Sequence, residues 1–320
     1  MKKISIVIPT YNELENIELL VNELNDLLNE KLSAYSNEII IIDNYSTDGT
    51  RDKIKEICSR NENVKGILNA KNFGQLNSPF YGMTQATGDA VILMVADFQD
   101  PPKMILDFID EWEKGYKIVI GIKSKSKESK LMYFLRTLYY KMINKIANVD
   151  HIEHFTGFGL YDKDFINILR KLEDPSPYLR GIVAELGFTR KELNYEQPQR
   201  KFGKTKNNFY SLYDIGMLGI TSYSKVILRI STFVGFIVGG LSFLLSVIYL
   251  ILKLIFWYSF PVGTAPILIG IFFLGGLQLF FIGILGEYIM NINTKILKSP
   301  LAHVEERINF IEDRNLNNDK

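Results

Sequence analysis

Two long stretches near the C-terminus contain no charged residue, and they constrain the fold more than any other feature of the chain. They cover residues 230–252 and 254–286, which are 23 and 33 residues long, and only Lys253 separates them. An α-helix rises about 1.5 Å per residue, so about 20 apolar residues cross the roughly 30 Å hydrocarbon core of a membrane. The sequence therefore predicts a two-helix transmembrane hairpin over residues 230–290. A buried helical hairpin in a soluble protein is the alternative.

Basic residues flank both predicted spans and indicate their orientation. Lys225 and Arg229 precede the first span, and Lys295 and Lys298 follow the second. Because loops rich in Lys and Arg remain in the cytosol, both flanks are expected there. Lys253, between the two spans, weakly favours the opposite orientation, although its long side chain can snorkel to a headgroup. The prediction is a multi-pass protein of the cell (inner) membrane whose N-terminal domain is cytoplasmic.

The 320 residues divide into four predicted parts where the composition changes. Residues 1–206 form a globular domain, residues 207–229 a juxtamembrane amphipathic segment, residues 230–290 the hairpin and residues 291–320 a cytosolic C-terminal tail. The formal net charge of +1 favours no class of partner. A single cysteine and three histidines argue against a disulfide framework and against a Cys/His zinc site.

Apolar strands and amphipathic helices alternate through the N-terminal domain. Strands are expected at residues 2–9, 38–43, 64–68, 90–95 and 116–121. Helices are expected at residues 12–29, 46–58, 75–86 and from Pro101 onward. Uninterrupted apolar strands that alternate with helices predict a mostly parallel sheet covered on both faces. The expected fold class is therefore α/β.

Acidic residues recur where three of these strands end. They lie in residues 9–13, 43–48 and 97–100. In open α/β sheets, ligands bind beyond the carboxyl ends of the strands, so these three segments are expected to meet at one site. The chain has no Gly-rich phosphate loop of the Walker or dinucleotide-binding type, which excludes those devices for holding a nucleotide.

The third of these segments has two interpretations. It belongs to the stretch VILMVADFQDPPKMI, in which a buried strand runs into two carboxylates and a Pro-Pro pair. In one interpretation, Asp100 caps the next helix and Pro101 occupies its first position. In the other, Asp97 and Gln99 hold a divalent cation that neutralises a diphosphate leaving group.

Several motifs occur in the order found in one known family. The motifs are SIVIPTYNELENI, IIDNYSTDGT, KNFGQ, GDAVILMVADFQDPP, TGFGLYDK, YLRGIVAELGF, QRKFGKTK and GILGEYI. With these motifs, the chain resembles the membrane-anchored family-2 glycosyltransferases, of the bacterial polyprenyl-phosphate glycosyltransferase and dolichol-phosphate mannose synthase type. The resemblance covers about residues 3–292. The resemblance implies a GT-A (Rossmann-like) fold, inversion at the anomeric carbon, and sugar transfer from a nucleotide sugar to a polyprenyl phosphate lipid.

The same resemblance implies roles for residues on the donor side. The nucleoside of the nucleotide sugar is expected to contact Pro9, Tyr11, Glu13 and Asp43. Mg²⁺ or Mn²⁺ is the expected cofactor, because the metal-binding positions of the family hold oxygen donors here. Those positions are Asp97 and Gln99.

Basic residues are implied for the diphosphate and for the lipid acceptor. Arg200 and Lys206 match a loop that closes over the diphosphate, and with Asp97 they are the expected catalytic residues. Lys123 and Arg136 fall where the family places basic residues for the acceptor phosphate.

Three positions depart from the usual pattern of the family. Val95 replaces the first Asp of D-x-D-L-Q-D, and Gly157 stands where many relatives have an Asp that is sometimes proposed as the base. Asn291 stands where a basic residue is common. The acceptor is a phosphate monoester with a second pKa of about 6, so it is largely a dianion near pH 7 and needs positioning more than deprotonation.

Two basic clusters remain. Residues 123–130 are either a solvated loop or, with the amphipathic aromatic stretch 131–149 that follows, part of a helix on the membrane surface. The second cluster is RKFGKTK, residues 200–206. Neither cluster belongs to a nucleic-acid-binding motif, so nucleic acid is not an expected partner.

The predicted function is sugar transfer to polyprenyl (undecaprenyl) phosphate at the cytosolic membrane face, for modification of cell-envelope glycans. UDP-glucose is the default donor, and other sugars and nucleotides stay open. The alternatives are a glycosyltransferase that acts on a lipid-linked saccharide or polymer, and a non-catalytic membrane partner protein. Small residues in the spans, in GFIVGG and LGG, favour a homo-oligomer.

Overall fold

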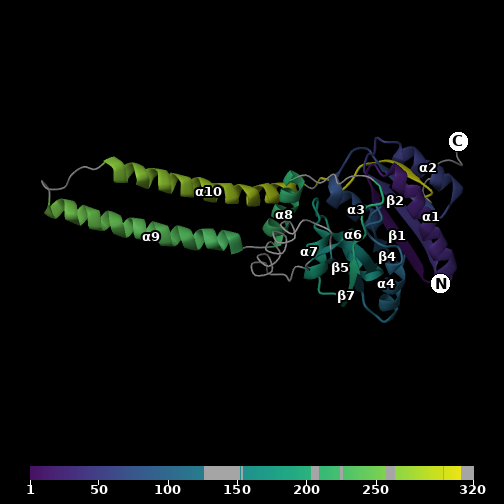
Figure 1. Cartoon of the computed structure of the whole chain (residues 1–320). Helices are drawn as coiled ribbons and strands as arrows, with labels where there is room; N and C mark the ends of the chain where they lie inside the picture. The colour runs from purple at the N-terminus through teal and green to yellow at the C-terminus, as the bar shows by residue number, and fades with distance from the viewer. Residues whose placement is uncertain are drawn as a thin grey trace.

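One sheet of eight strands organises the N-terminal part of the computed structural model (Figure 1). The structure describes residues 1–125, 152, 154–202, 209–223, 226–256, 264–297 and 299–310. The strand order is β7-β5-β6-β4-β1-β2-β3-β8. The strands are β1 (Lys3–Thr10), β2 (Ser36–Asp43), β3 (Val64–Asn69), β4 (Ala90–Leu93), β5 (Ile118–Lys125), β6 (Phe155–Asp162), β7 (Arg190–Glu196) and β8 (Val304–Ile308).

Most of the strands run in one direction. β1 pairs in parallel with β2 and with β4, and β2 pairs in parallel with β3. β6 is antiparallel to β4 and to β5, so β5 and its parallel neighbour β7 run in the direction of β4. β8 is antiparallel to β3. The predicted α/β class with a mostly parallel sheet is confirmed, and the five expected strands are β1 to β5.

Helices cover both faces of this sheet. The helices are α1 (Leu14–Lys31), α2 (Thr50–Arg60), α3 (Gly74–Gln85), α4 (Met104–Glu113), α6 (Lys163–Lys171), α7 (Leu179–Glu185), α8 (Phe209–Tyr223), α9 (Val226–Ile255) and α10 (Thr264–Ile296). Buried residues of α1, α2 and α4 form one core with the sheet, and buried residues of α3, α6 and α7 form the other. The sheet is therefore the middle layer of three.

The alternation of side chains along each strand explains the two cores. Ile4, Ile6 and Ile8 of β1 belong to the first core, and Val7 between them belongs to the second. Successive residues of a strand point to opposite faces, so a strand covered on both faces needs an uninterrupted apolar run. Full burial of each side chain of this size stabilises the folded state by about 1.5–3 kcal/mol relative to leaving it exposed to water.

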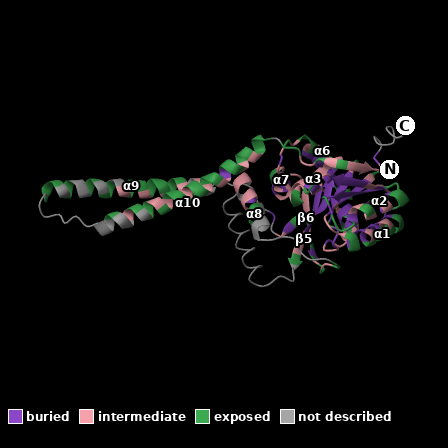
Figure 2. Ribbon diagram, turned by 90° about the horizontal axis from the view of Figure 1, so that it is seen from above, coloured by how far each residue is buried: buried purple, intermediate pink, exposed green. Residues whose placement is uncertain are grey.

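α9 and α10 leave the sheet domain and run side by side (Figures 1 and 2). Large apolar side chains along both helices face outward, in contrast to the buried sheet (Figure 2). Phe236 of α9 is 76% exposed and Leu279 of α10 is 71% exposed. Exposed apolar surface of this extent marks a membrane or protein interaction site, because water does not solvate it well.

Within the described part of the chain, one segment is long and apolar enough to cross a membrane. It is Phe273–Ile296 in α10, and none of its most apolar window is buried inside the protein. A buried helical hairpin is therefore excluded for this segment. Ile230–Ser242 in α9 is apolar but shorter. One candidate span is shown, and the second predicted span is not established by the structure.

α8 packs against the end of α10 that is nearest the sheet domain. The Asn291 Nδ2 of α10 donates to the Thr221 Oγ1 at 3.0 Å and to the Ser222 Oγ at 3.2 Å. The Tyr213 hydroxyl donates to the Glu287 carboxylate at 3.0 Å. Asn291, the departure noted in the sequence, therefore joins α10 to the helix that precedes the hairpin.

The chain returns to the sheet after α10. β8, from the segment that the sequence assigns to the C-terminal tail, adds an edge strand beside β3. Asn309 Nδ2 donates to the backbone oxygens of Cys58 and Val64, each at 2.8 Å. Arg51 forms an ion pair with Glu305 at 2.6 Å. The chain that follows the hairpin is thus fixed to the sheet domain.

Candidate active site

The carboxyl ends of β1, β2, β4, β5 and β7 lie at one edge of the sheet. This follows from the pairing, because those five strands share one direction. The three acidic segments expected to meet at one site follow β1, β2 and β4 and therefore do meet at this edge. The loop after β7, which carries Arg200, joins them there.

The loop after β1 is locked to the loop after β2. The Asn12 backbone N–H donates to the Ser46 Oγ at 2.7 Å, and the Asn12 Oδ1 accepts from the Thr47 N–H at 2.8 Å. Asn12 has a φ of 55°, in the left-handed region that Asn tolerates. Asp43 is fully buried and accepts hydrogen bonds from the Ser46 hydroxyl and N–H. Burial raises the pKa of Asp43, and the bonds from Ser46 oppose that rise.

The other predicted nucleoside residues lie beside this pair of loops. Pro9 is near the end of β1, and Pro9, Tyr11 and Glu13 are half-buried. The Glu13 carboxylate accepts from the Asn16 Nδ2 at 2.7 Å, and the same nitrogen is 3.4 Å from the Phe202 carbonyl oxygen. The loop after β7 therefore reaches across to the start of α1.

Asn44 organises the loop after β3, a role that the sequence did not reveal. Its Oδ1 accepts from the Phe73 N–H at 2.8 Å, and its Nδ2 donates to the Asn72 Oδ1 at 2.8 Å. Phe73 and Asn72 belong to the motif KNFGQ, which was recognised without an assigned function. The carboxamide of one loop thus fixes the next loop at the same edge of the sheet.

Asp97 and Arg200 form an ion pair at the centre of the edge. The Arg200 Nε lies 3.1 Å from the Asp97 Oδ2, and Asp97 is only 4% exposed. The Asp97 Oδ1 accepts from the Gln99 backbone N–H at 3.1 Å. The Lys201 Nζ lies 4.4 Å from the centre of the Phe98 ring. Two residues far apart in the chain, both expected in the site, are therefore brought into contact.

The donor set at Asp97 fits a small divalent cation that takes most of its ligands from a substrate. Within the part of the chain that the structure describes, no group of three or more His, Cys, Asp or Glu side chains gathers to hold a metal. Mg²⁺ in nucleotide sites is commonly held by one or two carboxylates with phosphate oxygens and water. Asp97 offers one such carboxylate, and Gln99, which is half-buried and two residues further on, carries an amide oxygen. Val95 is 37% exposed and adds no oxygen.

Asp100 does not cap a helix, so that prediction was wrong. α4 begins later, at Met104, and its N-cap residue makes no side-chain capping bond. The Asp100 carboxylate instead accepts from the Val95 N–H at 3.0 Å and from the Tyr195 hydroxyl at 3.1 Å. Burial raises the pKa of Asp100 to about 6, although the Val95 N–H and the Lys123 charge lower it. Asp100 therefore ties the end of β4 to β7.

Gly157 and Lys123 lie on the β5–β6 side of the edge. Gly157 has a φ of 108°, which a residue with a side chain adopts only with strain. The Lys123 N–H donates to the His154 carbonyl oxygen at 3.4 Å, next to the start of β6. Arg136 and Lys206, the other two predicted basic residues, lie outside the residues that the structure describes.

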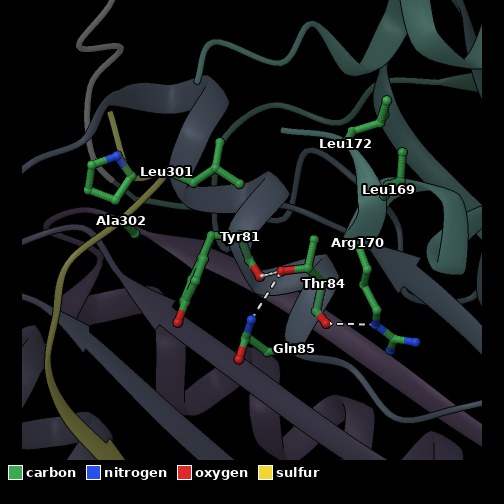
Figure 3. Close-up of a pocket in the computed structure, with 9 residues that line it drawn as sticks. Tyr81, Thr84, Gln85, Leu169, Arg170, Leu172, Leu301 and Ala302 are labelled. Atoms are coloured by element: carbon green, nitrogen blue, oxygen red, sulfur yellow. Dashed lines mark hydrogen bonds between the residues drawn. The ribbon is translucent and has the colours of Figure 1, made fainter. Parts of the chain in front are cut away.

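A cavity of about 420 Å³ lies elsewhere, between α3, α6 and the chain before β8 (Figure 3). Tyr81, Thr84, Leu169, Arg170 and Leu301 are among its lining residues, and no predicted site residue is. The Arg170 Nε donates to the Thr84 carbonyl oxygen at 3.0 Å, which satisfies the end of α3. Arg170 therefore supports the end of α3, where it also donates to the Ala86 carbonyl oxygen.

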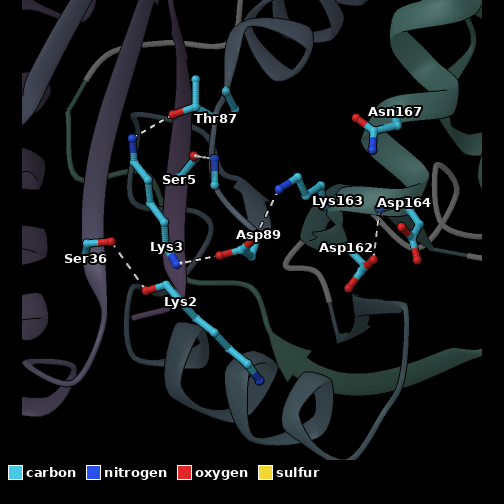
Figure 4. Close-up of polar contacts among 12 residues, drawn as sticks. Lys2, Lys3, Ser5, Ser36, Thr87, Asp89, Asp162, Lys163, Asp164 and Asn167 are labelled. Atoms are coloured by element: carbon cyan, nitrogen blue, oxygen red, sulfur yellow. Dashed lines mark hydrogen bonds and ion pairs between the residues drawn. The ribbon is translucent and has the colours of Figure 1, made fainter.

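A second cluster of charges lies at the amino end of the sheet, near the N-terminus of β1 (Figure 4). The Lys3 N–H donates to the Asp89 carboxylate at 2.9 Å, and the Lys3 Nζ donates to the Thr87 hydroxyl at 2.6 Å. The Lys163 Nζ is 3.4 Å from Asp89. These charges pair with each other at the edge opposite the site, so their contribution is to the fold.

Comparison with known proteins identifies relatives over most of the length of this chain. The family model for glycosyl transferase family 2 matches residues 5–187. The protein CsbB of Bacillus subtilis is 34% identical over 307 residues, which is 95% of this chain and 91% of CsbB. The SfII prophage-derived bactoprenol glucosyl transferase of Shigella flexneri is 32% identical over 300 residues, or 93% of this chain and 96% of that protein.

One solved structure to which this chain is similar comes from Mycobacterium tuberculosis. It is glucosyl-3-phosphoglycerate synthase in complex with Mn²⁺, UDP and phosphoglyceric acid. The TM-score is 0.46 at 16% sequence identity, over 69% of this chain and 76% of that one.

The family match covers more than half of the chain, and the relatives extend it through the hairpin. The three-layer arrangement around a mostly parallel sheet is the GT-A-like α/β fold expected of such enzymes. This chain therefore belongs to glycosyl transferase family 2.

Proposed function

We propose that the protein transfers glucose from UDP-glucose to polyprenyl (undecaprenyl) phosphate at the cytosolic face of the cell (inner) membrane. The product, polyprenyl-phosphate glucose, would serve the modification of cell-envelope glycans. The observation that carries the proposal is the Asp97–Arg200 pair at the strand-end edge of a domain attached to an exposed apolar hairpin. The name of the Shigella flexneri relative, a bactoprenol glucosyl transferase, supports both the sugar and the lipid.

The proposed reaction is a single displacement at C1 of glucose. An oxygen of the lipid phosphate forms the new bond to C1 while the bond from C1 to the UDP oxygen breaks, so UDP leaves and the configuration inverts. The acceptor is already largely a dianion near neutral pH, and no base is required. Arg200 leaves Asp97 to contact the diphosphate as negative charge develops on it, and Lys206 of the same loop is proposed to assist.

Asp97 and Gln99 are proposed to hold Mg²⁺ or Mn²⁺ with the donor diphosphate. A divalent cation there would neutralise charge on the leaving group. The Asp97 carboxylate faces Arg200. A cation held by Asp97 and the Arg200 guanidinium would therefore both contact the diphosphate. Pro9, Tyr11, Glu13 and Asp43 are proposed for the nucleoside, and Lys123 and Arg136 for the acceptor phosphate.

The membrane arrangement is also a proposal. We place two transmembrane helices in residues 230–290, with residues 1–206, the segment 207–229 and the tail 291–320 on the cytosolic side. The span Phe273–Ile296 and the exposed apolar side chains of α9 support this arrangement. Reporter fusions at residues 1 and 320 should both give cytosolic signals, and a fusion at Gly263 should give an external one. A full-length chain that stays monomeric in water without detergent would contradict it.

A homo-oligomer in the membrane is proposed on the small residues of the hairpin. Gly235, Gly239, Gly275 and Gly276 have open space where a side chain would stand, which leaves room for a second helix to approach. Mass measurement of the protein in nanodiscs tests this proposal. A monomer alone, at the concentrations at which the enzyme is active, would refute it.

The function is tested with a panel of labelled nucleotide sugars, membranes that contain the protein, and added undecaprenyl phosphate. We expect label from UDP-glucose to enter the organic phase only when the lipid phosphate is present. Transfer that instead requires a lipid-linked saccharide or polymer would favour the first alternative function. A chain that transfers no sugar from any donor, yet still resides in the membrane, would favour a non-catalytic partner.

A further inference from the structure

The motif YLRGIVAELGF has no role in the reaction described so far. Its residues form α7 and the turn that follows, and Arg180 lies in the first turn of this helix. α6 begins at the end of β6 that is opposite the site and ends at Lys171, and the segment 172–178 then leads into α7. Arg180 is half-buried.

The start of α7 lies against the site edge of the sheet. A side-chain carbon placed on Gly157 would be 3.6 Å from the Leu93 Cδ2 and 3.9 Å from the Leu179 Cδ2. Leu93 is the last residue of β4, in the strand that leads to Asp97. Arg180 follows Leu179 directly, so a cationic side chain begins next to Gly157 and close to the end of β4.

The charge of Arg180 acts on the same small region. The Tyr161 hydroxyl donates to the Gly157 carbonyl oxygen at 2.7 Å. Burial raises the pKa of Tyr161, the Asp100 charge raises it further, and the Arg180 charge opposes both. Arg180 and the buried Asp100 are therefore both within electrostatic range of the hydroxyl that holds Gly157. The Arg180 guanidinium also lies 5.9 Å from the centre of the Tyr178 ring.

The segment before α7 contacts the end of the apolar hairpin. The Lys295 Nζ, in the last turn of α10, lies 3.6 Å from the Asp174 Oδ2. The Asn77 Nδ2 donates to the Pro175 carbonyl oxygen at 2.9 Å, which fixes the segment on α3. The end of a membrane span lies at the level of the lipid headgroups. Arg180 thus follows a segment that reaches from the membrane end of α10 to the site.

We propose that Arg180 binds the phosphate of the polyprenyl phosphate acceptor, beside Gly157, an inference that rests on the proposed function. A guanidinium suits a phosphate because it donates two parallel hydrogen bonds and keeps its charge. Gly157 brings no carboxylate to repel the phosphate. A phosphate held here would have its lipid tail toward α10 and its nucleophilic oxygen toward the Asp97 side of the edge.

The test uses the full-length protein in detergent micelles with a polyprenyl phosphate of short chain. Initial rates are measured against acceptor concentration and, separately, against UDP-glucose concentration. We expect Arg180→Gln to raise the KM for the acceptor by about 10-fold or more, because a charge-assisted bidentate contact is lost. The KM for UDP-glucose should stay within about twofold. Arg180→Lys should have a KM for the acceptor between those of the wild type and Arg180→Gln, since an ammonium keeps the charge without the paired geometry.

Arg190→Gln is the matched control. Arg190 begins β7 at the opposite edge of the sheet and pairs with Glu192 at 3.0 Å, so its loss should leave both KM values unchanged. An unchanged acceptor KM in Arg180→Gln would overturn the inference while the wild type still transfers glucose. If Arg180→Gln does not fold, as judged by UDP binding in calorimetry, the acceptor KM of Arg180→Lys decides in the same way. A wild type that transfers nothing to the lipid phosphate would instead refute the proposed function.

Discussion

The two halves of the strand-end edge are built differently. The nucleoside half consists of the loops after β1, β2 and β3, where polar side chains bond mainly to each other and to backbone amides, as Asn12 does with Ser46 and Asn44 with Phe73. The transfer half consists of the residues after β4 and β7, the end of β5 and the start of β6, where charges are opposed, as in the Asp97–Arg200 pair. Lys123 and Arg180 add further positive charge to the second half.

This difference separates binding from chemistry. A network of hydrogen bonds among side chains and backbone amides is preorganised before the substrate arrives, and its loss removes both stability and donor affinity. An ion pair such as Asp97–Arg200 can exchange partners when a diphosphate and a cation enter, so its loss should mainly lower the rate of transfer.

Asp97→Asn should give the largest effect. It removes the carboxylate that faces both Arg200 and the proposed cation, and the expected loss of transfer exceeds about 10³-fold, or ~4 kcal/mol. Circular dichroism should show an unchanged fold. EDTA should stop the wild type, and added Mg²⁺ or Mn²⁺ should restore it. Full activity of Asp97→Asn in EDTA would remove Asp97 from the chemistry.

Arg200→Ala should lower turnover by on the order of 2–4 kcal/mol in the transition state, because a charge facing the diphosphate is lost. Arg200 lies in a loop and is partly exposed, so the fold should persist. The KM for UDP-glucose should change less than kcat, and Arg190→Ala serves as control. A rise in the KM for UDP-glucose as large as the fall in kcat would contradict the distinction between the two halves. Lys206→Ala, in the same loop, is expected to act in the same direction.

Glu38→Gln should destabilise the fold without a specific effect on either half. Glu38 is buried at the amino edge and bonds to Lys65 at 2.6 Å and to Lys3 at 2.9 Å. Burial alone would raise the pKa of Glu38, but hydrogen bonds led by the one from Lys65 lower it to about 2. A pKa depressed in the folded state adds stability above the unfolded value of 4.5, which is lost as pH falls toward about 2.

The expected size of this contribution is about 3 kcal/mol. Denaturant unfolding of the wild type and Glu38→Gln between pH 7 and pH 3 measures it, at detergent concentrations held constant. The difference in the free energy of unfolding between the wild type and Glu38→Gln should become smaller as the pH falls. A difference in the free energy of unfolding that does not change with pH would mean that the charge of Glu38 does not stabilise the fold.

Asn44→Ala should give the smallest effect. This effect should fall on the binding of UDP-glucose. It leaves the Phe73 N–H without its side-chain acceptor, which costs about 1–3 kcal/mol for a buried group. The KM for UDP-glucose should rise while kcat stays within about threefold. Thermal unfolding with and without UDP separates lost stability from lost affinity. A large fall in kcat at unchanged KM would place Asn44 with the transfer half.

The fold was largely predictable because its central strands are buried on both faces. Uninterrupted apolar runs such as residues 39–42 and 90–95 mark such strands in the sequence, and they became parts of β2 and β4. β7 was missed because it lies at the edge of the sheet and is mostly polar: it begins with three charged residues, and only Leu193 and Tyr195 are apolar or aromatic. β8 was missed because its five residues, VEERI, are mostly charged.

The site was predictable in its location and less so in its contacts. Strand ends with acidic residues converge for topological reasons, so the placement of Asp43 and Asp97 followed from the sheet. Asp100 was misread because a local pattern, Asp before Pro-Pro, favours a cap, whereas its real partner, Tyr195, comes from another strand far along the chain. Asn44 gave no local signal, since its partners lie in the next loop.

The central claim is that the lipid phosphate, held in the transfer half, displaces UDP at C1 of glucose. NMR of the product formed by the wild type from UDP-glucose, which is an α-glycoside, and polyprenyl phosphate tests it most directly. The account predicts one product, a phosphodiester in which C1 of glucose is bonded to the lipid phosphate in the β configuration. An α-linked product, or glucose attached anywhere other than to the phosphate, would contradict it.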